Sequence, residues 1–145
     1  MSKIYTVIAA GGLGKRLQNY GDSKKTKMLL EINGQSMITK QLNQLISWNL
    51  DNFIVITNPK YDKLIKDDLS KNMSDLDVEY SLQDEQLGVA HALLQAEKLV
   101  PEDAKILYIL GDNFFEFNPL KDLDISESNA SIFLTKVSNP EEFGV

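Results

Sequence analysis

A glycine-rich segment near the N-terminus carries residue types that bind phosphate. The stretch "VIAAGGLGKRL" (residues 7–17) runs from apolar residues into Gly11, Gly12 and Gly14 and then into a basic pair. Glycines let backbone N–H groups close on an anion, because no Cβ obstructs the approach. Arg16 adds a forked, permanently charged donor that suits phosphate oxygens. The segment therefore indicates a site for a phosphate-bearing ligand.

Two common phosphate motifs do not fit this segment. A P-loop needs G-x-x-x-x-G-K-[S/T], but Ala9 stands at the first glycine position and Arg16 replaces the hydroxyl. A dinucleotide fingerprint needs a third small residue that opens into a helix, whereas Leu17 occupies that position and poorly patterned residues follow. We favour a third kind of glycine loop, in which Lys27 returns after an irregular segment as a second cation.

A carboxylate follows a later apolar stretch. Asp112 comes directly after residues 106–110 and Gly111, and a glycine there permits close approach of a ligand. Mg²⁺ takes one or two carboxylates together with phosphates and water, so Asp112 is a candidate magnesium ligand. Taken alone, "GDN" fits a turn-forming aspartate equally well.

Strand and helix patterns alternate along the chain. Apolar runs typical of strands buried in a parallel sheet fall at residues 4–10, 53–56, 106–110 and 130–137, with a weaker run at 78–82. Helical patterns lie between them, and Ser36 is placed to cap the first. The predicted apolar sides of the three helices are Ile38, Leu42 and Leu45, then Leu64 and Ile65, and last Val89, Leu93, Ala96 and Val100. The alternation predicts an α/β fold with a mainly parallel sheet flanked on both faces by helices.

This fold class also predicts where a ligand binds. In open α/β sheets, ligands lie beyond the carboxyl ends of the strands. The segments at those ends are residues 11–27, 58–60, 83–88 and 111–115. We therefore expect the glycine segment and Asp112 to meet at one edge of the sheet.

Composition narrows the class of protein. A length of 145 residues predicts one domain, and the net charge of −6 argues against a general nucleic-acid binder. Between positions 15 and 27, however, there are five basic residues and one acidic residue. The local net charge of +4 suits a small polyanion. We expect no membrane segment and no signal peptide. Together with the absence of cysteine, this predicts a cytoplasmic protein.

Four segments in order carry a resemblance to a known family. "AAGGLGKRL…TKMLLEINGQSMI" resembles the opening signature of the sugar-phosphate nucleotidylyltransferases, which include glucose-1-phosphate thymidylyl- and uridylyltransferases. "QDEQLGVAHAL" resembles their base-binding segment, "YILGDNFF" their metal-binding strand end, and "NPEEFGV" the start of their sugar-binding region. The resemblance implies a Rossmann-like three-layer fold, dependence on Mg²⁺, and transfer of a nucleotidyl group from dTTP or UTP to a sugar 1-phosphate.

The resemblance also implies roles for individual residues. Arg16 would hold the leaving phosphates, and Lys27 would neutralise charge near the α-phosphate. The family usually has proline before this lysine, whereas Thr26 stands here. Lys24 and Lys25 are rival candidates, although the following "MLLEINGQSMI" favours Lys27.

The remaining roles concern the nucleotide, the sugar and the metal. Asp112 would bind Mg²⁺, Gly144 would contact the sugar, and an amide and a glycine would read the base. The expected nucleotide-binding residues are Ala10, Gly11, Gly12, Gly14, Gln83 and Gly88. We expect His91 to pack beside the base rather than to catalyse, because the reaction needs no proton transfer.

The family's chains continue past the match to "NPEEFGV". We therefore expect residues 1–145 to form the nucleotide-binding part of a nucleotidyltransferase domain, with most of the sugar-binding part absent. Such a chain would bind nucleoside triphosphate weakly, show little turnover and associate as a homo-oligomer. Two alternatives stay open: a nucleotide-binding module without turnover of its own, and a cytidylyl- or guanylyltransferase that acts on a non-sugar phosphate.

Overall fold

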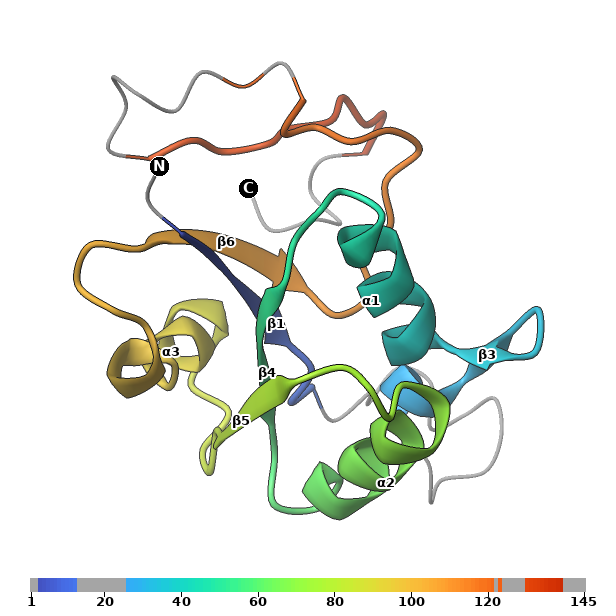
Figure 1. The fold of residues 1–145 in the computed structure, drawn as a ribbon. Coiled ribbons are helices and arrows are strands. Elements are labelled where there is room, and N and C mark those ends of the chain that lie inside the picture. Colours follow the sequence, from blue (N-terminus) through green and yellow to red (C-terminus); the bar gives the residue numbers. More distant parts are fainter. Residues whose placement is uncertain (1–2, 13–25, 122, 124–129, 140–145) are drawn as a thin grey trace. The chain divides into compact units, whose positions relative to one another are not determined.

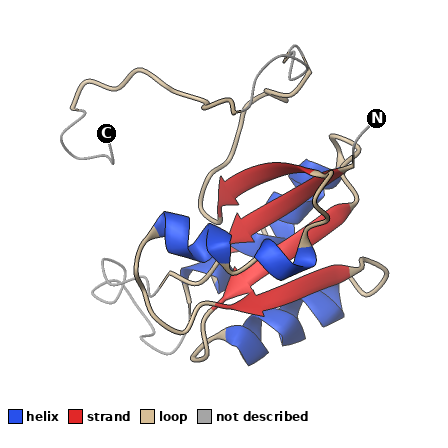
Figure 2. Cartoon of the chain, turned by 90° about the vertical axis from the view of Figure 1, so that its left-hand side faces the viewer, coloured by secondary structure: helices blue, strands red, loops and turns tan. Residues whose placement is uncertain are grey.

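A four-stranded parallel sheet forms the centre of the protein. A computed structural model describes residues 3–12, 26–121, 123 and 130–139, and residues 1–114 form one compact unit while residues 115–145 form another. The sheet belongs to the first unit and has the order β5-β4-β1-β6. Its strands, whose arrows all point the same way in Figure 2, are β1 (Ile4–Ala9), β4 (Asn52–Thr57), β5 (Val78–Leu82) and β6 (Lys105–Leu110).

Helices cover both faces of this sheet. Helices α1 (Met37–Ile46) and α2 (Asp62–Asn72) lie on one face, and α3 (Val89–Leu94), with the short 3-10 helix η3 (Glu97–Leu99) after it, lies on the other (Figure 1). From β1 the chain moves outward to β4 and β5, and then returns to β6 on the opposite side of β1. This arrangement confirms the predicted Rossmann-like three-layer α/β fold. No helix in the described part of the chain is long and apolar enough to cross a membrane.

The central strands are mostly apolar because both of their faces are covered. Val7, Ile54 and Ile56 pack with Ala92 and Ala96 from the α3 side. Neighbouring residues of the same strands point to the opposite face, since successive strand side chains alternate, and they are also fully buried. The continuous apolar pattern of residues 4–10 and 53–56 thus reflects a two-sided core.

A short hairpin leads into α1. Strands β2 (Glu31–Ile32) and β3 (Gln35–Ser36) pair antiparallel, and the residues between them, Asn33 and Gly34, have φ angles of 54° and 78°. Such positive angles suit asparagine and glycine in a two-residue turn. The Ser36 hydroxyl accepts a hydrogen bond from the N–H of Thr39 at 3.3 Å and caps α1 as predicted.

Each of the other two helical segments keeps part of its predicted apolar side in the core but exposes one predicted residue. Leu93 and Val100 pack against the core as predicted. In α2 the buried residues are Ile65 and Leu69, whereas Leu64 is 42% exposed. On the α3 side Ala92 and Ala96 are buried, and Val89 is 57% exposed. The prediction that Leu64 and Val89 face the core was therefore wrong, because each helix also carries apolar residues on its exposed side.

The strand predicted at residues 130–137 is absent. Residues 130–139 form no regular element, and Ile132 and Leu134 are 82% and 87% exposed. A strand needs the backbone of a neighbouring strand as a hydrogen-bond partner. In the described residues no strand pairs with this segment, so an apolar, β-branched composition was not enough to form one.

Candidate functional site

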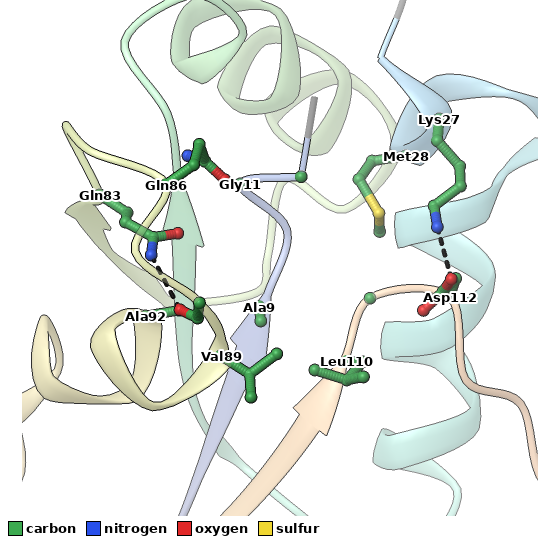
Figure 3. Close-up of a pocket in the computed structure, with 13 residues that line it drawn as sticks. Ala9, Gly11, Lys27, Met28, Gln83, Gln86, Val89, Ala92, Leu110 and Asp112 are labelled. Carbon is green, nitrogen blue, oxygen red and sulfur yellow. Dashed lines mark hydrogen bonds and ion pairs between the residues drawn. The ribbon is translucent and has the colours of Figure 1, made fainter. Parts of the chain in front are cut away.

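A cleft of about 260 Å³ lies at the carboxyl ends of β1, β5 and β6 (Figure 3). Its lining comes from three of the four segments that the strand-end rule singled out, residues 11–27, 83–88 and 111–115, together with the ends of β1 and β6, Met28 and α3. The predicted site residues that line it are Gly11, Gly12, Lys27, Gln83, Gly88 and Asp112. The fold therefore brings together, in one place, six residues that are spread over a hundred positions of the sequence.

Of the remaining predicted site residues, only Ala10 lies in the described part of the chain, and it does not line the cleft. Ala10 is buried, and its N–H donates a hydrogen bond of 2.8 Å to the carbonyl of Ile56, so it joins β1 to β4. Gly14, Arg16 and Gly144 lie outside the described residues.

The glycine wall of the cleft is fixed by residues after β4. The side-chain amide of Asn58 donates a hydrogen bond of 2.7 Å to the carbonyl of Gly11. A Cβ at Gly11 would lie 3.2 Å from the carbonyl oxygen of Thr57, which is a tight contact. A Cβ at Gly12 meets nothing within 4 Å among the described residues. Packing within the described protein therefore explains glycine at position 11 but not at position 12.

The opposite wall is the turn that carries Asp112. The N–H of Gly111 donates a hydrogen bond of 3.0 Å to the carbonyl of Ala9, which ties this turn to β1. A Cβ at Gly111 would lie 2.9 Å from that carbonyl oxygen and 2.7 Å from the sulfur of Met28. Glycine is required here because the turn lies directly against β1 and Met28.

Gly111→Ala is therefore expected to destabilise the protein by about 1–3 kcal/mol, the usual cost of forcing an extra carbon into a packed site. Urea denaturation of the purified variant measures this free energy of unfolding. The matched control is Gly12→Ala, whose Cβ has open space among the described residues and whose effect is expected to stay within about 0.5 kcal/mol. Equal unfolding free energies for the two variants would contradict the proposed fit of the turn.

Lys27 reaches the cleft from a separate short helix. It begins the 3-10 helix η2 (Lys27–Leu29), which the buried Thr26 caps by accepting a hydrogen bond of 3.3 Å from the N–H of Met28. Thr26 thus gives this turn a defined start, at the position where the sugar-phosphate nucleotidylyltransferases usually have proline. The Lys27 ammonium forms an ion pair with the Asp112 carboxylate, and the two side chains are 30% and 42% exposed.

Gln41 supports the Asp112 turn from α1. Its Nε2 donates hydrogen bonds of 2.9 Å to the carbonyls of Leu110 and Asn113, which flank Gly111 and Asp112. The Gln41 side chain is 1% exposed, and its Oε1 is buried without a hydrogen-bond partner in the described part of the chain. Its role in the site was not predicted from the sequence. A glutamine beside the apolar side of a helix was the available signal.

Gln83 forms the third wall, at the end of β5. Its backbone N–H donates to the carbonyl of Thr57 at 2.8 Å, and its Nε2 donates to the carbonyl of Gly88 at 3.1 Å. Gly88 has a φ angle of 101°, which a residue with a Cβ rarely adopts. The Gln83 Oε1 points into the cleft (Figure 3). The cleft therefore presents the amide oxygen of Gln83 on the side away from the Lys27–Asp112 ion pair.

The wall beside Gly88 is held by β6. The Tyr108 hydroxyl donates a hydrogen bond of 2.7 Å to the carbonyl of Val89, and burial raises the pKa of Tyr108. The phenol therefore stays protonated at neutral pH and keeps this donor. It fixes the start of α3 relative to the strand that carries Asp112.

The donors of the cleft suit a divalent cation that arrives with phosphates. Among the described residues there is no group of three or more His, Cys, Asp or Glu side chains that could hold a metal ion. Asp112 is a partly exposed carboxylate that already accepts a cation, the Lys27 ammonium. Mg²⁺ is commonly bound by one or two carboxylates, with substrate phosphates and waters completing its shell. Asp112 fits that mode of binding.

The chain is similar to proteins of a known family. The nucleotidyl transferase family matches residues 5–145. The bifunctional protein GlmU of Thermoanaerobacter pseudethanolicus is 32% identical over 149 residues, which cover 99% of this chain and 30% of that protein. The chain thus spans about 30% of the length of such curated relatives.

Solved structures agree with this likeness. A protein of Bacillus anthracis assigned as a glucose-1-phosphate thymidylyltransferase, solved in complex with sucrose, has a TM-score of 0.67 and 28% identity. That match covers 75% of this chain and 44% of the other. The inositol-1-phosphate CTP transferase of T. maritima has a TM-score of 0.66, covering 77% of this chain and 44% of the other. At 19% identity the second likeness concerns the fold alone.

Proposed function

Because the chain belongs to the nucleotidyl transferase family, we propose that it binds dTTP or UTP in the cleft and transfers the nucleotidyl group to a sugar 1-phosphate. Pyrophosphate is the second product. One observation supports the proposal most: two glycines, an ammonium, a carboxylate and an amide, each suited to one part of a nucleoside triphosphate and its metal ion, line the same cleft.

The proposed reaction poses an electrostatic problem. The second pKa of a phosphate monoester lies near ~6, so a sugar 1-phosphate is largely ionised at pH 7 and needs no general base. One of its oxygens forms a bond to the α-phosphorus, and the bond from that phosphorus to the bridging oxygen of the pyrophosphate breaks. The protein must hold two anions together and stabilise the charge on the leaving group.

Each residue of the cleft has a proposed role in holding the phosphates or the metal ion. The backbone at Gly11 and Gly12 lies where a triphosphate can approach closely, and Lys27 supplies a positive charge for the α-phosphate. Asp112 would hold Mg²⁺ together with phosphate oxygens, and the bound ion neutralises phosphate charge. For Arg16 and Gly144, contacts with the leaving phosphates and the sugar stay predictions, as does association into a homo-oligomer.

Titration of the purified chain with UTP, dTTP, CTP, ATP and GTP in the presence of Mg²⁺ tests the proposal. Calorimetry is expected to show tighter binding of UTP and dTTP than of CTP or ATP. Preference for ATP or GTP, or binding of none of the five, would contradict the proposed site.

A second measurement separates binding from turnover. Release of pyrophosphate from UTP or dTTP is followed with glucose 1-phosphate or N-acetylglucosamine 1-phosphate as acceptor. Pyrophosphate release that depends on the acceptor supports transfer. Nucleotide binding without release would instead support the alternative of a nucleotide-binding module. Tightest binding of CTP, with release that requires a non-sugar phosphate, would support the cytidylyltransferase alternative.

A further inference from the structure

We propose that His91 is a positioning residue for nucleobase selection, because it holds the Gln83 amide with its oxygen facing the cleft. In this orientation the site accepts bases that carry a ring N–H and disfavours bases with an unprotonated ring nitrogen at that place. The inference rests on the proposed function, since it concerns which nucleotide the cleft takes.

The orientation of the amide follows from two neighbours of its nitrogen. Nε2 of Gln83 lies 3.1 Å from the carbonyl oxygen of Gly88 and 3.1 Å from Nδ1 of His91. A carbonyl oxygen only accepts hydrogen bonds, so the amide atom that faces it must be the NH₂ group. With His91 Nδ1 as the second acceptor, both amide hydrogens are used. Oε1 is then left for a ligand, and it points into the cleft (Figure 3).

The single ring proton of neutral His91 must then lie on Nε2. That nitrogen faces Gln95, whose own Nε2 lies 3.2 Å away and also donates to the His91 carbonyl at 3.0 Å. A neutral imidazole has one protonated nitrogen and one nitrogen that accepts a hydrogen bond. The ring can therefore accept from the amide of Gln83 or from that of Gln95, but not from both.

Burial decides this competition in favour of Gln83. The Gln83 side chain is 4% exposed, whereas Gln95 is only partly buried. A buried donor that loses its acceptor pays its full desolvation cost, but an amide in contact with water turns to solvent at little cost. The Gln95 amide therefore turns to solvent, and Nδ1 of His91 stays unprotonated and accepts the hydrogen bond from Gln83.

The ligand chemistry follows from Oε1 of Gln83, which faces the cleft. Uracil and thymine carry an N3–H, and guanine carries an N1–H, so each can donate to this oxygen. Cytosine and adenine present an unprotonated ring nitrogen at the equivalent place. That nitrogen and Oε1 of Gln83 are both hydrogen-bond acceptors, so no hydrogen bond forms between them. A site built to accept a hydrogen bond rejects a partner that cannot donate one, because its buried polar groups are then left unpaired.

His91→Phe tests the inference, because it keeps a ring but removes the acceptor. The measured quantity is the ratio of the dissociation constants for CTP and UTP, determined by calorimetry with Mg²⁺. We expect this ratio to fall about three- to tenfold, the scale of one hydrogen bond. His91→Asn, which offers an oxygen near the position of Nδ1, is expected to retain the ratio. The matched control Gln95→Ala, on the other side of the ring, is expected to leave it unchanged.

The outcomes separate this inference from the proposed function. An unchanged ratio in His91→Phe, or the same fall in Gln95→Ala, would overturn the positioning role while leaving the function intact. Failure of the unaltered chain to bind either nucleotide would contradict the proposed function, and the inference with it. If thermal melting shows that His91→Phe is unfolded, His91→Ala takes its place in the same comparison with His91→Asn.

Discussion

Asp112→Asn is expected to weaken binding of UTP in the presence of Mg²⁺ by at least ~10–100-fold, the loss typical when a metal site is disturbed. In the absence of metal, binding is expected to stay unchanged or to become slightly tighter. The carboxylate repels phosphate when no ion lies between them, and it also engages the Lys27 ammonium. Removing its charge therefore has opposite effects under the two conditions.

Calorimetry with Mg²⁺ and with a chelator measures both effects on the same protein. The matched control is Asp67→Asn, since Asp67 is an exposed carboxylate that pairs with Lys63 on α2, outside the cleft lining. It is expected to change neither affinity. An equal loss of affinity with and without Mg²⁺ would show that Asp112 acts on the nucleotide in another way.

Stability is not expected to obscure this result. The Lys27–Asp112 pair is partly exposed on both sides, and exposed ion pairs contribute at most about 1 kcal/mol to folding. The thermal unfolding midpoint of Asp112→Asn should therefore stay close to that of the unaltered chain.

Lys27→Met is expected to weaken binding of UTP both with and without Mg²⁺, by about 10–100-fold, because a hydrogen bond to a charged group contributes roughly 1.5–3 kcal/mol. Methionine keeps most of the side-chain length and removes the charge. Where transfer is measurable, its rate is expected to fall ~10²–10³-fold, the scale for losing one contact to developing charge. Equilibrium titration and pyrophosphate release measure the two effects.

Lys63→Met is the control for this substitution, because it removes an ammonium from the exposed Lys63–Asp67 pair. Lys27→Arg keeps a positive charge and should retain part of the affinity. If Lys27→Met binds UTP as tightly as the unaltered chain, Lys27 does not contact the phosphates, and the rivals Lys24 and Lys25 become the better candidates.

The sheet could be predicted closely from the sequence. The strands expected at 4–10, 53–56, 78–82 and 106–110 agree with β1, β4, β5 and β6 to within about one residue at each end. Short apolar runs mark strands that are covered on both faces, and this signal is local. The run at 130–137 failed because its composition says nothing about whether a neighbouring strand is present to pair with it.

Part of the site followed from the same local signal. Once the strands are placed, the strand-end rule brings Gly11, Gln83 and Asp112 to one edge of the sheet. The supporting role of Gln41 could not be predicted, because its partners are backbone carbonyls 69 and 72 positions away. His91 was expected to pack beside the base, and its contact with Gln83 depends on how α3 is rotated on the sheet.

The hydrogen bond between Gly111 and Ala9 has a consequence for how the family can diversify. It joins the carboxylate wall to the glycine wall through adjacent strands, so the spacing between them is inherited from the sheet itself. Lys27 instead arrives on η2, which contacts both α1 and α2. Substitutions in either helix can therefore shift the lysine, whereas the spacing between the two walls is set by the pairing of β1 with β6.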